Sequence, residues 1–118
     1  MLEVIFYRDS RDRLSSVFAR GHAAFADHGE DVVCAAVSAI LQTARLGLET
    51  YASIPLESTQ EPGEMHLLWP ESARDDPAVR AIITTAELAV EKIAGQYPDH
   101  VKFVRKLDRR ATPHPESG

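Results

Sequence analysis

The chain has 118 residues, with 13 Lys and Arg against 18 Asp and Glu, so its formal net charge is −5. This length suits a single domain, and hydrophobic and charged contents of 44% and 26% are ordinary for a folded globular protein. The negative charge argues against a general affinity for nucleic acid, which depends on basic side chains that displace phosphate counterions. The single cysteine, Cys34, excludes an intrachain disulfide, a Cys-only zinc site and a C-x-x-C redox pair.

The first two expected elements are strands that would form a hairpin. Residues 2–8 carry β-branched and aromatic side chains at a period of two, which is typical of a strand. The turn-forming residues 9–12 follow, and 13–20 is a second short candidate strand. The segment 21–30 is rich in small and polar residues and has no sustained periodicity, so we predict a loop there.

A long helix is predicted next, beginning at Asp31 and ending near Ser53, ahead of Pro55. Asp31 is a suitable N-cap, because its carboxylate can accept a hydrogen bond from a free backbone N–H in the first turn. Residues 32–41 are apolar or small nearly all round, so we expect this half to be buried on several sides. The stripe of helical spacing consists of Val33, Val37, Ile40, Leu41, Ala44, Leu48 and Tyr51.

The second half of the chain repeats this order of elements. Residues 56–60 and 64–69 are predicted strands joined by a Pro-Gly turn. Asp76 and Pro77 fit the N-cap and the first position of a second amphipathic helix, where the missing proline N–H costs nothing. The segment 101–107 alternates as a last strand. Trp69 is expected in the core.

The predicted order β-β-α-β-β-α-β defines the fold class. Two helices and a mostly antiparallel sheet can each bury one face against the other, which gives a two-layer α+β sandwich with both helices on one face. We expect a single domain over residues 1–107. The polar, proline-containing segment 108–118 is predicted to be a disordered tail.

Two further features bear on where the protein works. No run of apolar residues approaches the ~18 of a membrane span. The N-terminal residues also lack the basic-then-apolar layout of a secretory signal. We therefore expect a cytoplasmic protein without membrane contact.

Cys34 is the first candidate functional residue. If Asp31 is the N-cap, Cys34 is the third residue of the helix, where free N–H groups and the positive end of the helix dipole favour an anion. A thiol in that position loses its proton more readily than a free cysteine, and the thiolate is the nucleophile. The alternative is that Cys34 fills the core as a small apolar side chain, as many free cysteines do.

His22 is the candidate base. It follows Gly21, which lets the backbone turn sharply or approach a substrate closely, and it precedes the loop that leads to Cys34. If that loop folds back, the imidazole and the thiol can meet, and a nucleophile beside a base is the minimum arrangement for cysteine acyl transfer. Otherwise His22 is an exposed loop histidine without function, and His28 is a competing base nearer the loop centre.

The neighbouring polar residues leave other roles open. His22, His28 and Cys34 could supply three metal ligands, but the compact spacing of a zinc site is absent, so we expect no metal or other cofactor. Asp31 can cap the helix or steer His22, and capping is the favoured role. Ser38 lies one turn after Cys34 on the same face, where it can hydrogen-bond near the site or bond back to its own helix.

A resemblance to a known family is visible at these residues. Gly21-His22-Ala23, a short Gly-containing loop and then residues 29–39 (GEDVVCAAVSA) closely resemble the signature of the ribosomal-processing cysteine protease family, Prp. The specific parts are G-H-A and G-x-D-[IV]-V-C-A-A-x-S, while the second half of the chain fits in length and element order. The resemblance implies a bacterial cytosolic cysteine endopeptidase that removes a short N-terminal extension from a large-subunit ribosomal protein, a step needed for ribosome assembly or function. It also implies a homodimer.

Carried over position by position, the resemblance makes His22 the general base and Cys34 the nucleophile, with Gly21, Asp31 and Ser38 as supporting signature positions. The alternative from another class is a non-catalytic module that binds a ribosomal protein during assembly, since an acidic domain attracts a basic partner. A thiol-dependent redox enzyme is less favoured, because the chain has no second cysteine to resolve a disulfide.

Overall fold

The computed structural model describes residues 1–21 and 28–108. In this part of the chain the predicted order of strands and helices is confirmed. The elements are β1 (Leu2–Arg8), β2 (Leu14–Arg20), α1 (His28–Leu46) with a π-helical continuation η2 (Gly47–Tyr51), β3 (Glu57–Glu61), β4 (Glu64–Leu68), a 3-10 turn η3 (Glu71–Ala73), α2 (Pro77–Gln96) and β5 (Val101–Leu107).

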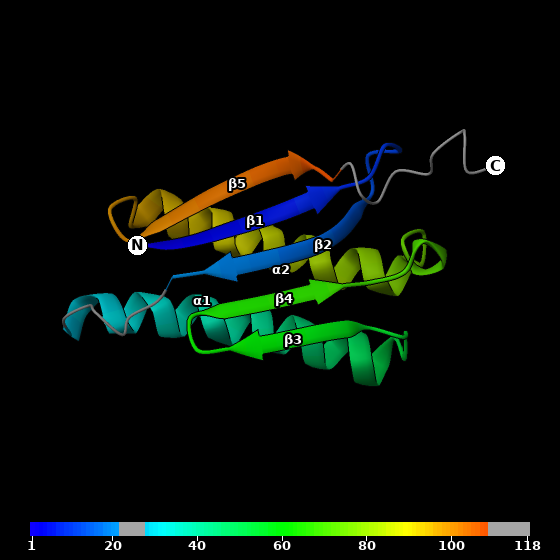
Figure 1. The fold of residues 1–118 in the computed structure, drawn as a ribbon, viewed down its shortest axis with the longest axis horizontal. Coiled ribbons are helices and arrows are strands. Elements are labelled where there is room, and N and C mark those ends of the chain that lie inside the picture. Colours follow the sequence, from blue (N-terminus) through cyan, green and yellow to red (C-terminus); the bar gives the residue numbers. More distant parts are fainter. Residues whose placement is uncertain (22–27, 109–118) are drawn as a thin grey trace.

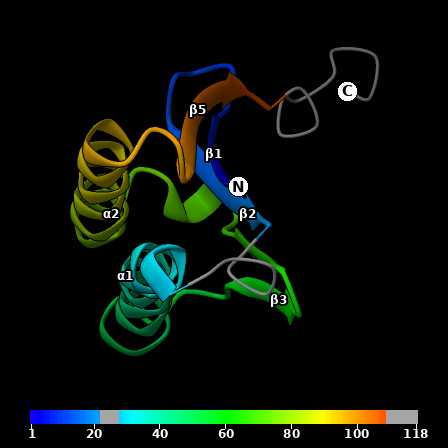
Figure 2. The ribbon, with the colours of Figure 1, turned by 90° about the vertical axis from the view of Figure 1, so that its left-hand side faces the viewer.

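The strands form one sheet in the order β3-β4-β2-β1-β5. The pairs β1–β2, β2–β4 and β3–β4 are antiparallel. β5 pairs with β1 in parallel, which the crossover through α2 allows. Figures 1 and 2 show α1 and α2 on one face of the sheet. The predicted fold class, a two-layer α+β sandwich with a mostly antiparallel sheet, is therefore confirmed.

The core lies between the sheet and the two helices. Successive side chains of a strand point to opposite faces of the sheet, so every second residue of a strand can pack against the helices. Phe6, Val17 and Leu67 are such residues, because Phe6 stands opposite Val17 and Val17 opposite Leu67 in the strand register. Trp69 belongs to this core as predicted, with no exposed surface, and its Nε1 donates a hydrogen bond of 2.8 Å to the carbonyl oxygen of Leu14. The indole is thus buried with its one donor satisfied.

The two long helices differ in how well their starts were predicted. α2 begins as expected, with the Asp76 side chain accepting a hydrogen bond of 2.8 Å from the backbone N–H two residues later and with Pro77 in the first position. α1 begins at His28 rather than after Asp31, so the prediction that Asp31 caps this helix is wrong. Glycine is a poor helix former, so Gly29 led to the prediction of a loop at a position that is helical in the structure.

The outer face of α1 contradicts the prediction that residues 32–41 are buried on several sides. Val33 and Val37 are buried, but Val32 is 70% exposed, and Tyr51 from the predicted stripe is 80% exposed. The reason is that the sheet and α2 cover only part of the helix.

The segment Val32–Tyr51 is also long and apolar enough, with a mean hydropathy of 1.4, to match a membrane span by length and composition, and 28% of it is buried. Alanine and other small side chains raise this mean, but Gln42, Arg45 and Glu49 interrupt the segment, so it contains no continuous apolar run of that length.

Glu87 on α2 joins the helix layer to two strands. Its side chain is buried and accepts hydrogen bonds from both terminal nitrogens of Arg8 on β1, at 2.7 and 3.0 Å. Arg105 on β5 donates a third, from Nε at 3.1 Å, and also pairs with the exposed Glu91. This carboxylate therefore bridges β1, β5 and α2.

Asp9 forms a second buried ionic group, just after β1. It accepts hydrogen bonds from the backbone N–H groups of Arg11 and Arg13, at 2.9 and 3.1 Å, and from the buried guanidinium of Arg74 at 3.1 Å. Burial raises the pKa of Asp9, but these backbone N–H groups and the Arg74 and Arg13 side chains together outweigh it, so the pKa lies below its ordinary value.

The division into a domain at 1–107 and a tail at 108–118 remains a prediction. Asp108 is buried, and its backbone N–H donates to the carbonyl oxygen of Arg8 at 2.7 Å, so hydrogen bonding between the β5 and β1 segments continues to this residue. Residues 109–118 lie outside the described part of the chain.

Candidate active site

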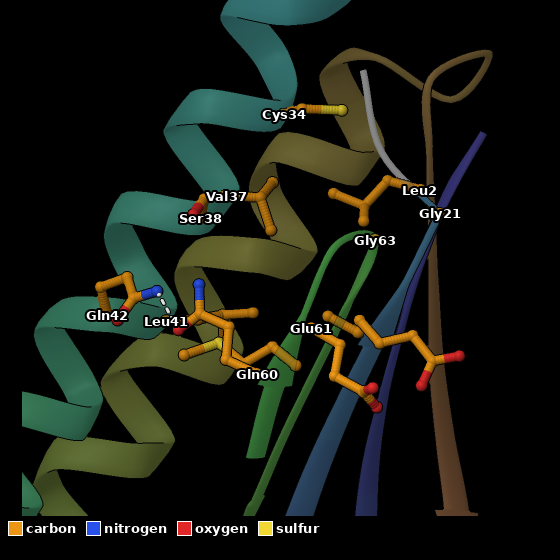
Figure 3. A pocket seen from close by; sticks show the side chains of 13 residues that line it. Leu2, Gly21, Cys34, Val37, Ser38, Leu41, Gln42, Gln60, Glu61 and Gly63 are labelled. Carbon is orange, nitrogen blue, oxygen red and sulfur yellow. Dashed lines mark hydrogen bonds between the residues drawn. The ribbon is translucent and has the colours of Figure 1, made fainter. Parts of the chain in front are cut away.

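A pocket lies between α1, the end of β2 and the turn that joins β3 to β4, with a volume of about 130 Å³ (Figure 3). Its apolar lining comes from both layers, with helix residues on one side and strand residues on the other. These apolar residues include Leu2, Val37, Leu41 and Met65. Because the pocket is formed where strand ends meet the helix, residues far apart in sequence surround one small volume.

Cys34 lines this pocket. The residue is half-buried and packs partly against the core, and Figure 3 shows its sulfur directed toward the side of the pocket formed by Leu2 and Gly21. It is therefore neither a fully buried core residue nor a fully exposed one. Because α1 begins at His28, Cys34 is the seventh helical residue rather than the third. The free N–H groups and the dipole effect are confined to the first turn, so the position of Cys34 in α1 does not support the predicted stabilisation of a thiolate by the helix start.

Gly21 lies at the end of β2 and also lines the pocket. Its φ is +82°, and a Cβ atom there would lie 2.3 Å from the carbonyl oxygen of Met1. Its backbone N–H donates to the carbonyl oxygen of Gly63 in the β3–β4 turn at 2.9 Å. The backbone at Gly21 therefore lies close to two other chain segments at the pocket wall, which leaves no room for a side chain there. A close approach to a substrate stays a prediction.

The polar side of the pocket follows α1. Ser38 is exposed and lines the pocket one turn after Cys34, as its spacing predicts, and Gln42 lies one turn further on. Gln42 Nε2 donates a hydrogen bond of 2.9 Å to Oε1 of Gln60 on β3. Neither glutamine was predicted from the sequence. The spacing from Cys34 could have indicated Gln42, whereas Gln60 reaches the pocket only through the tertiary fold.

Two carboxylates stand at the rim. Glu61 and Glu64 face each other in the register of the β3–β4 hairpin, are both exposed, and line the pocket. On the β2 side, Glu64 stands in register with Arg20, whose guanidinium is paired with Glu3 at 2.7 Å. The rim is therefore negatively charged. Nothing in the local sequence distinguishes these residues from ordinary hairpin glutamates.

Three of the predicted site features fall outside what the structure describes. His22 lies in the segment 22–27, and the side chains of His28 and Asp31 are likewise not described. The catalytic roles proposed for His22 and His28 stay predictions, and so does the alternative that Asp31 steers His22; only the capping role of Asp31 is excluded, because α1 already begins at His28. Gly21, the residue directly before His22, does line the same pocket as Cys34. Within the described residues, no group of three or more His, Cys, Asp or Glu side chains is arranged to hold a metal ion.

A half-buried thiol in a small pocket between a helix and the ends of strands is an arrangement suited to enzymes that use cysteine as a nucleophile. The family described as cysteine protease Prp matches residues 1–102 of this chain. The chain therefore belongs to the Prp family of cysteine proteases, as its signature residues indicated.

Individual relatives agree over nearly the whole chain. The ribosomal processing cysteine protease Prp of Bacillus subtilis is 27% identical over 111 residues, covering 91% of this chain and 99% of the relative. The crystal structure of SMU.848 from Streptococcus mutans superposes with a TM-score of 0.84 at 25% identity, covering 92% of this chain and 99% of that one. The essential ribosomal processing protease Prp of S. aureus, solved with a covalently linked product peptide, shares the fold with a TM-score of 0.79 at 20% identity, covering 90% of this chain and 100% of that one.

Proposed function

We propose that this chain is a cysteine endopeptidase that removes a short N-terminal extension from a large-subunit ribosomal protein, with Cys34 as nucleophile and His22 as general base. The observation that carries the proposal is the shared pocket. Cys34 and Gly21 line it together, and His22 is the next residue after Gly21. Membership of a cysteine protease family supports assigning the thiol a catalytic rather than a packing role.

The proposed chemistry has two stages. The Cys34 thiolate attacks the scissile carbonyl carbon, and the imidazolium of His22 gives its proton to the leaving amine as the C–N bond breaks. The remaining thioester is then attacked by water, from which His22 removes a proton. Hydrolysis releases the new carboxylate and returns the thiol. Both steps need only the groups of this chain and water, so no cofactor is invoked.

The substrate class is supported by charge and by relatives. The S. aureus protease has been solved with a substrate peptide, and the B. subtilis relative is a ribosomal processing protease. In this chain the rim carboxylates Glu61 and Glu64 and the net charge of −5 favour a basic protein over an acidic one. We place the reaction in the cytoplasm, with the ribosomal protein rather than nucleic acid or membrane as the partner.

The test is cleavage of a peptide that spans the N-terminal junction of the organism's own large-subunit ribosomal protein, followed by mass spectrometry. Cys34→Ala is expected to reduce the rate by at least about 10³-fold, and His22→Ala by about 10²- to 10⁴-fold. His66→Ala is the matched control, because His66 lies on β4 in register with Phe18, outside the residues that line the pocket.

Two outcomes would contradict the proposal. Cleavage that persists in Cys34→Ala rejects the thiol mechanism. Tight binding of the peptide without cleavage, unaffected by alkylation of the thiol, favours the alternative of a non-catalytic factor that holds a ribosomal protein during assembly.

We also propose a homodimer, formed through the outer faces of the helices. A groove of about 630 Å³ runs between α1 and α2 and is lined by small and apolar side chains. Its two threonines, Thr43 and Thr85, direct their hydroxyls to carbonyl oxygens of their own helices at 2.7 Å, so the groove offers few free polar groups. The exposed Leu46 and Leu88 lie on the same two helices. A second copy of the chain can supply such apolar side chains to the groove. A membrane surface is a less suitable partner, because helices that bind one are usually rich in Lys and Arg, and the groove is lined by neither.

The dimer is tested by light scattering of the parent protein and of two neighbouring substitutions. Thr85→Arg places a charge in the groove and is expected to give monomers. Thr84→Arg, on the adjacent exposed position outside the groove, is expected to leave the dimer intact. A monomeric parent protein, or equal behaviour of the two variants, would reject this surface.

A further inference from the structure

The pocket has two recognisable ends along α1. Cys34, Ser38 and Gln42 follow at intervals of four residues, so they share one face of the helix, and all three line the pocket. Eight residues span about 12 Å of helix axis. Figure 3 shows Cys34 at one end of this line and the pair Gln42–Gln60 at the other.

The second end is a bridge between the two layers of the fold. Gln42 belongs to α1, and Gln60 belongs to β3, the outermost strand on this side of the sheet. Gln60 stands opposite the buried Met65 in the hairpin register, so its side chain is on the face that meets the helices. The 2.9 Å hydrogen bond from Gln42 Nε2 to Gln60 Oε1 therefore crosses from helix to edge strand beside the pocket.

We propose that the Gln42–Gln60 bridge is the end wall of the substrate pocket and sets the largest substrate side chain that fits beside Cys34. This inference rests on the proposed protease function. The pocket volume of about 130 Å³ is close to the ~150 Å³ of a cavity that holds a benzene molecule. The lining by Val37, Leu41 and Met65 is apolar, so one apolar side chain of about that size fits while the bridge is closed. A two-ring side chain requires the bridge to open.

The two glutamines are thus specificity-determining residues rather than catalytic ones. The hydrogen bond between them is exposed, and neither residue belongs to the buried core, so their replacement should not prevent folding. Breaking the bridge should change which peptides are cleaved and leave the reactivity of the thiol unchanged.

The experiment compares kcat/KM for two sets of junction peptides that differ at a residue flanking the scissile bond, with leucine in one and tryptophan in the other. The residues on the two sides of the bond are varied in turn. For the side chain that enters the pocket, Gln42→Ala and Gln60→Ala are expected to raise the tryptophan-to-leucine ratio by about 10-fold or more, in the range that pocket contacts supply. Gln96→Ala makes the same chemical change at an exposed position outside the pocket and should keep the parental ratio.

Charge provides a second, nearly isosteric test. In Gln42→Glu or Gln60→Glu a single carboxylate can still accept a hydrogen bond from the remaining amide, because a glutamine side chain can donate or accept. Either single variant should therefore keep the parental selectivity. The double variant places two carboxylates against each other, which should open the bridge and give the selectivity of the alanine variants.

The outcomes separate this inference from the function on which it rests. If the parent protein cleaves the leucine peptide in a Cys34-dependent reaction and the alanine and double-glutamate variants leave the ratio unchanged, the bridge proposal is overturned and the protease function stands. If the parent protein cleaves no peptide, both fail. Iodoacetamide should alkylate Cys34 at equal rates in all variants, and unequal rates would mean that the bridge acts on the thiol rather than on pocket size.

Discussion

Replacing Gly21 by alanine tests whether the junction beside the pocket is as tight as its geometry indicates. An alanine Cβ would lie 2.3 Å from the carbonyl oxygen of Met1, and the residue would have to keep a φ of +82°. A left-handed conformation alone costs a non-glycine residue roughly 1–2 kcal/mol. Because the colliding atom is backbone, relief requires β1 or β2 to move, so we expect Gly21→Ala to lower the free energy of unfolding by at least about 2 kcal/mol.

The matched control is another glycine in the same protein. Gly95 lies in α2, and a Cβ there would meet nothing within 4 Å. Removing a glycine from a helix gains about 0.5–1 kcal/mol, so Gly95→Ala should be as stable as the parent protein or slightly more stable. Urea unfolding followed by circular dichroism measures both variants. If the free energy of unfolding of Gly21→Ala lies within about 0.5 kcal/mol of the parent value, the range of an ordinary surface substitution, the junction is not as tight as this geometry indicates.

Three other predictions concern groups away from the pocket. Glu87→Gln should lower the free energy of unfolding by about 2–3 kcal/mol. This is less than the ~3–5 kcal/mol expected for a fully buried ion pair, because the arginines bonded to Glu87 reach solvent. The control Glu91→Gln should change it by no more than ~1 kcal/mol, since Glu91 is exposed. Because the pKa of Asp9 is lowered in the folded protein, its contribution to stability is present above the ordinary pKa of an aspartate and is lost as the pH falls through the lower, folded-state pKa. In acid titrations of urea midpoints, Asp9→Asn should therefore lose less stability than the parent protein below that ordinary pKa. Trp69→Phe should cost about 1–3 kcal/mol in the same unfolding assay, because it leaves the carbonyl oxygen of Leu14 without its indole donor; equal stability of parent and variant would contradict the role given to that hydrogen bond.

The strands and the second helix were predictable because local chemistry and tertiary contacts agree there. Asp76 and Pro77 provide a cap and a fixed first turn, and the Pro-Gly pair at 62–63 fixes the β3–β4 turn. The start of α1 was not predictable in the same way. Gly29 disfavours helix on propensity, yet α1 extends through it to His28.

The prediction that residues 32–41 of α1 are buried on several sides was wrong for a different reason. A hydrophobic pattern shows which side chains avoid water but not which surface covers them. Val32 and Tyr51 are exposed in the single chain, and the proposed homodimer is one surface that would cover part of this face.

The candidate site was predictable only where its residues lie close together in sequence. Gly21, Cys34 and Ser38 line one pocket, and their proximity could be inferred from a signature of eighteen residues. The strand side of the pocket, including Gln60 and Glu64, depends on the pairing of β2 with β4. Such long-range pairing is not contained in local periodicity.

The proposed activation of the Cys34 thiol by His22 can be measured as the rate of alkylation by iodoacetamide as a function of pH. Because Cys34 is the single cysteine, the rate reports one site. We expect the parent protein to react with an apparent thiol pKa clearly below the ordinary value of ~8.5. His22→Ala should move the profile back toward that value, whereas His66→Ala should not. Identical profiles in all three proteins, with a midpoint at or above the ordinary value, would mean that His22 does not activate this thiol.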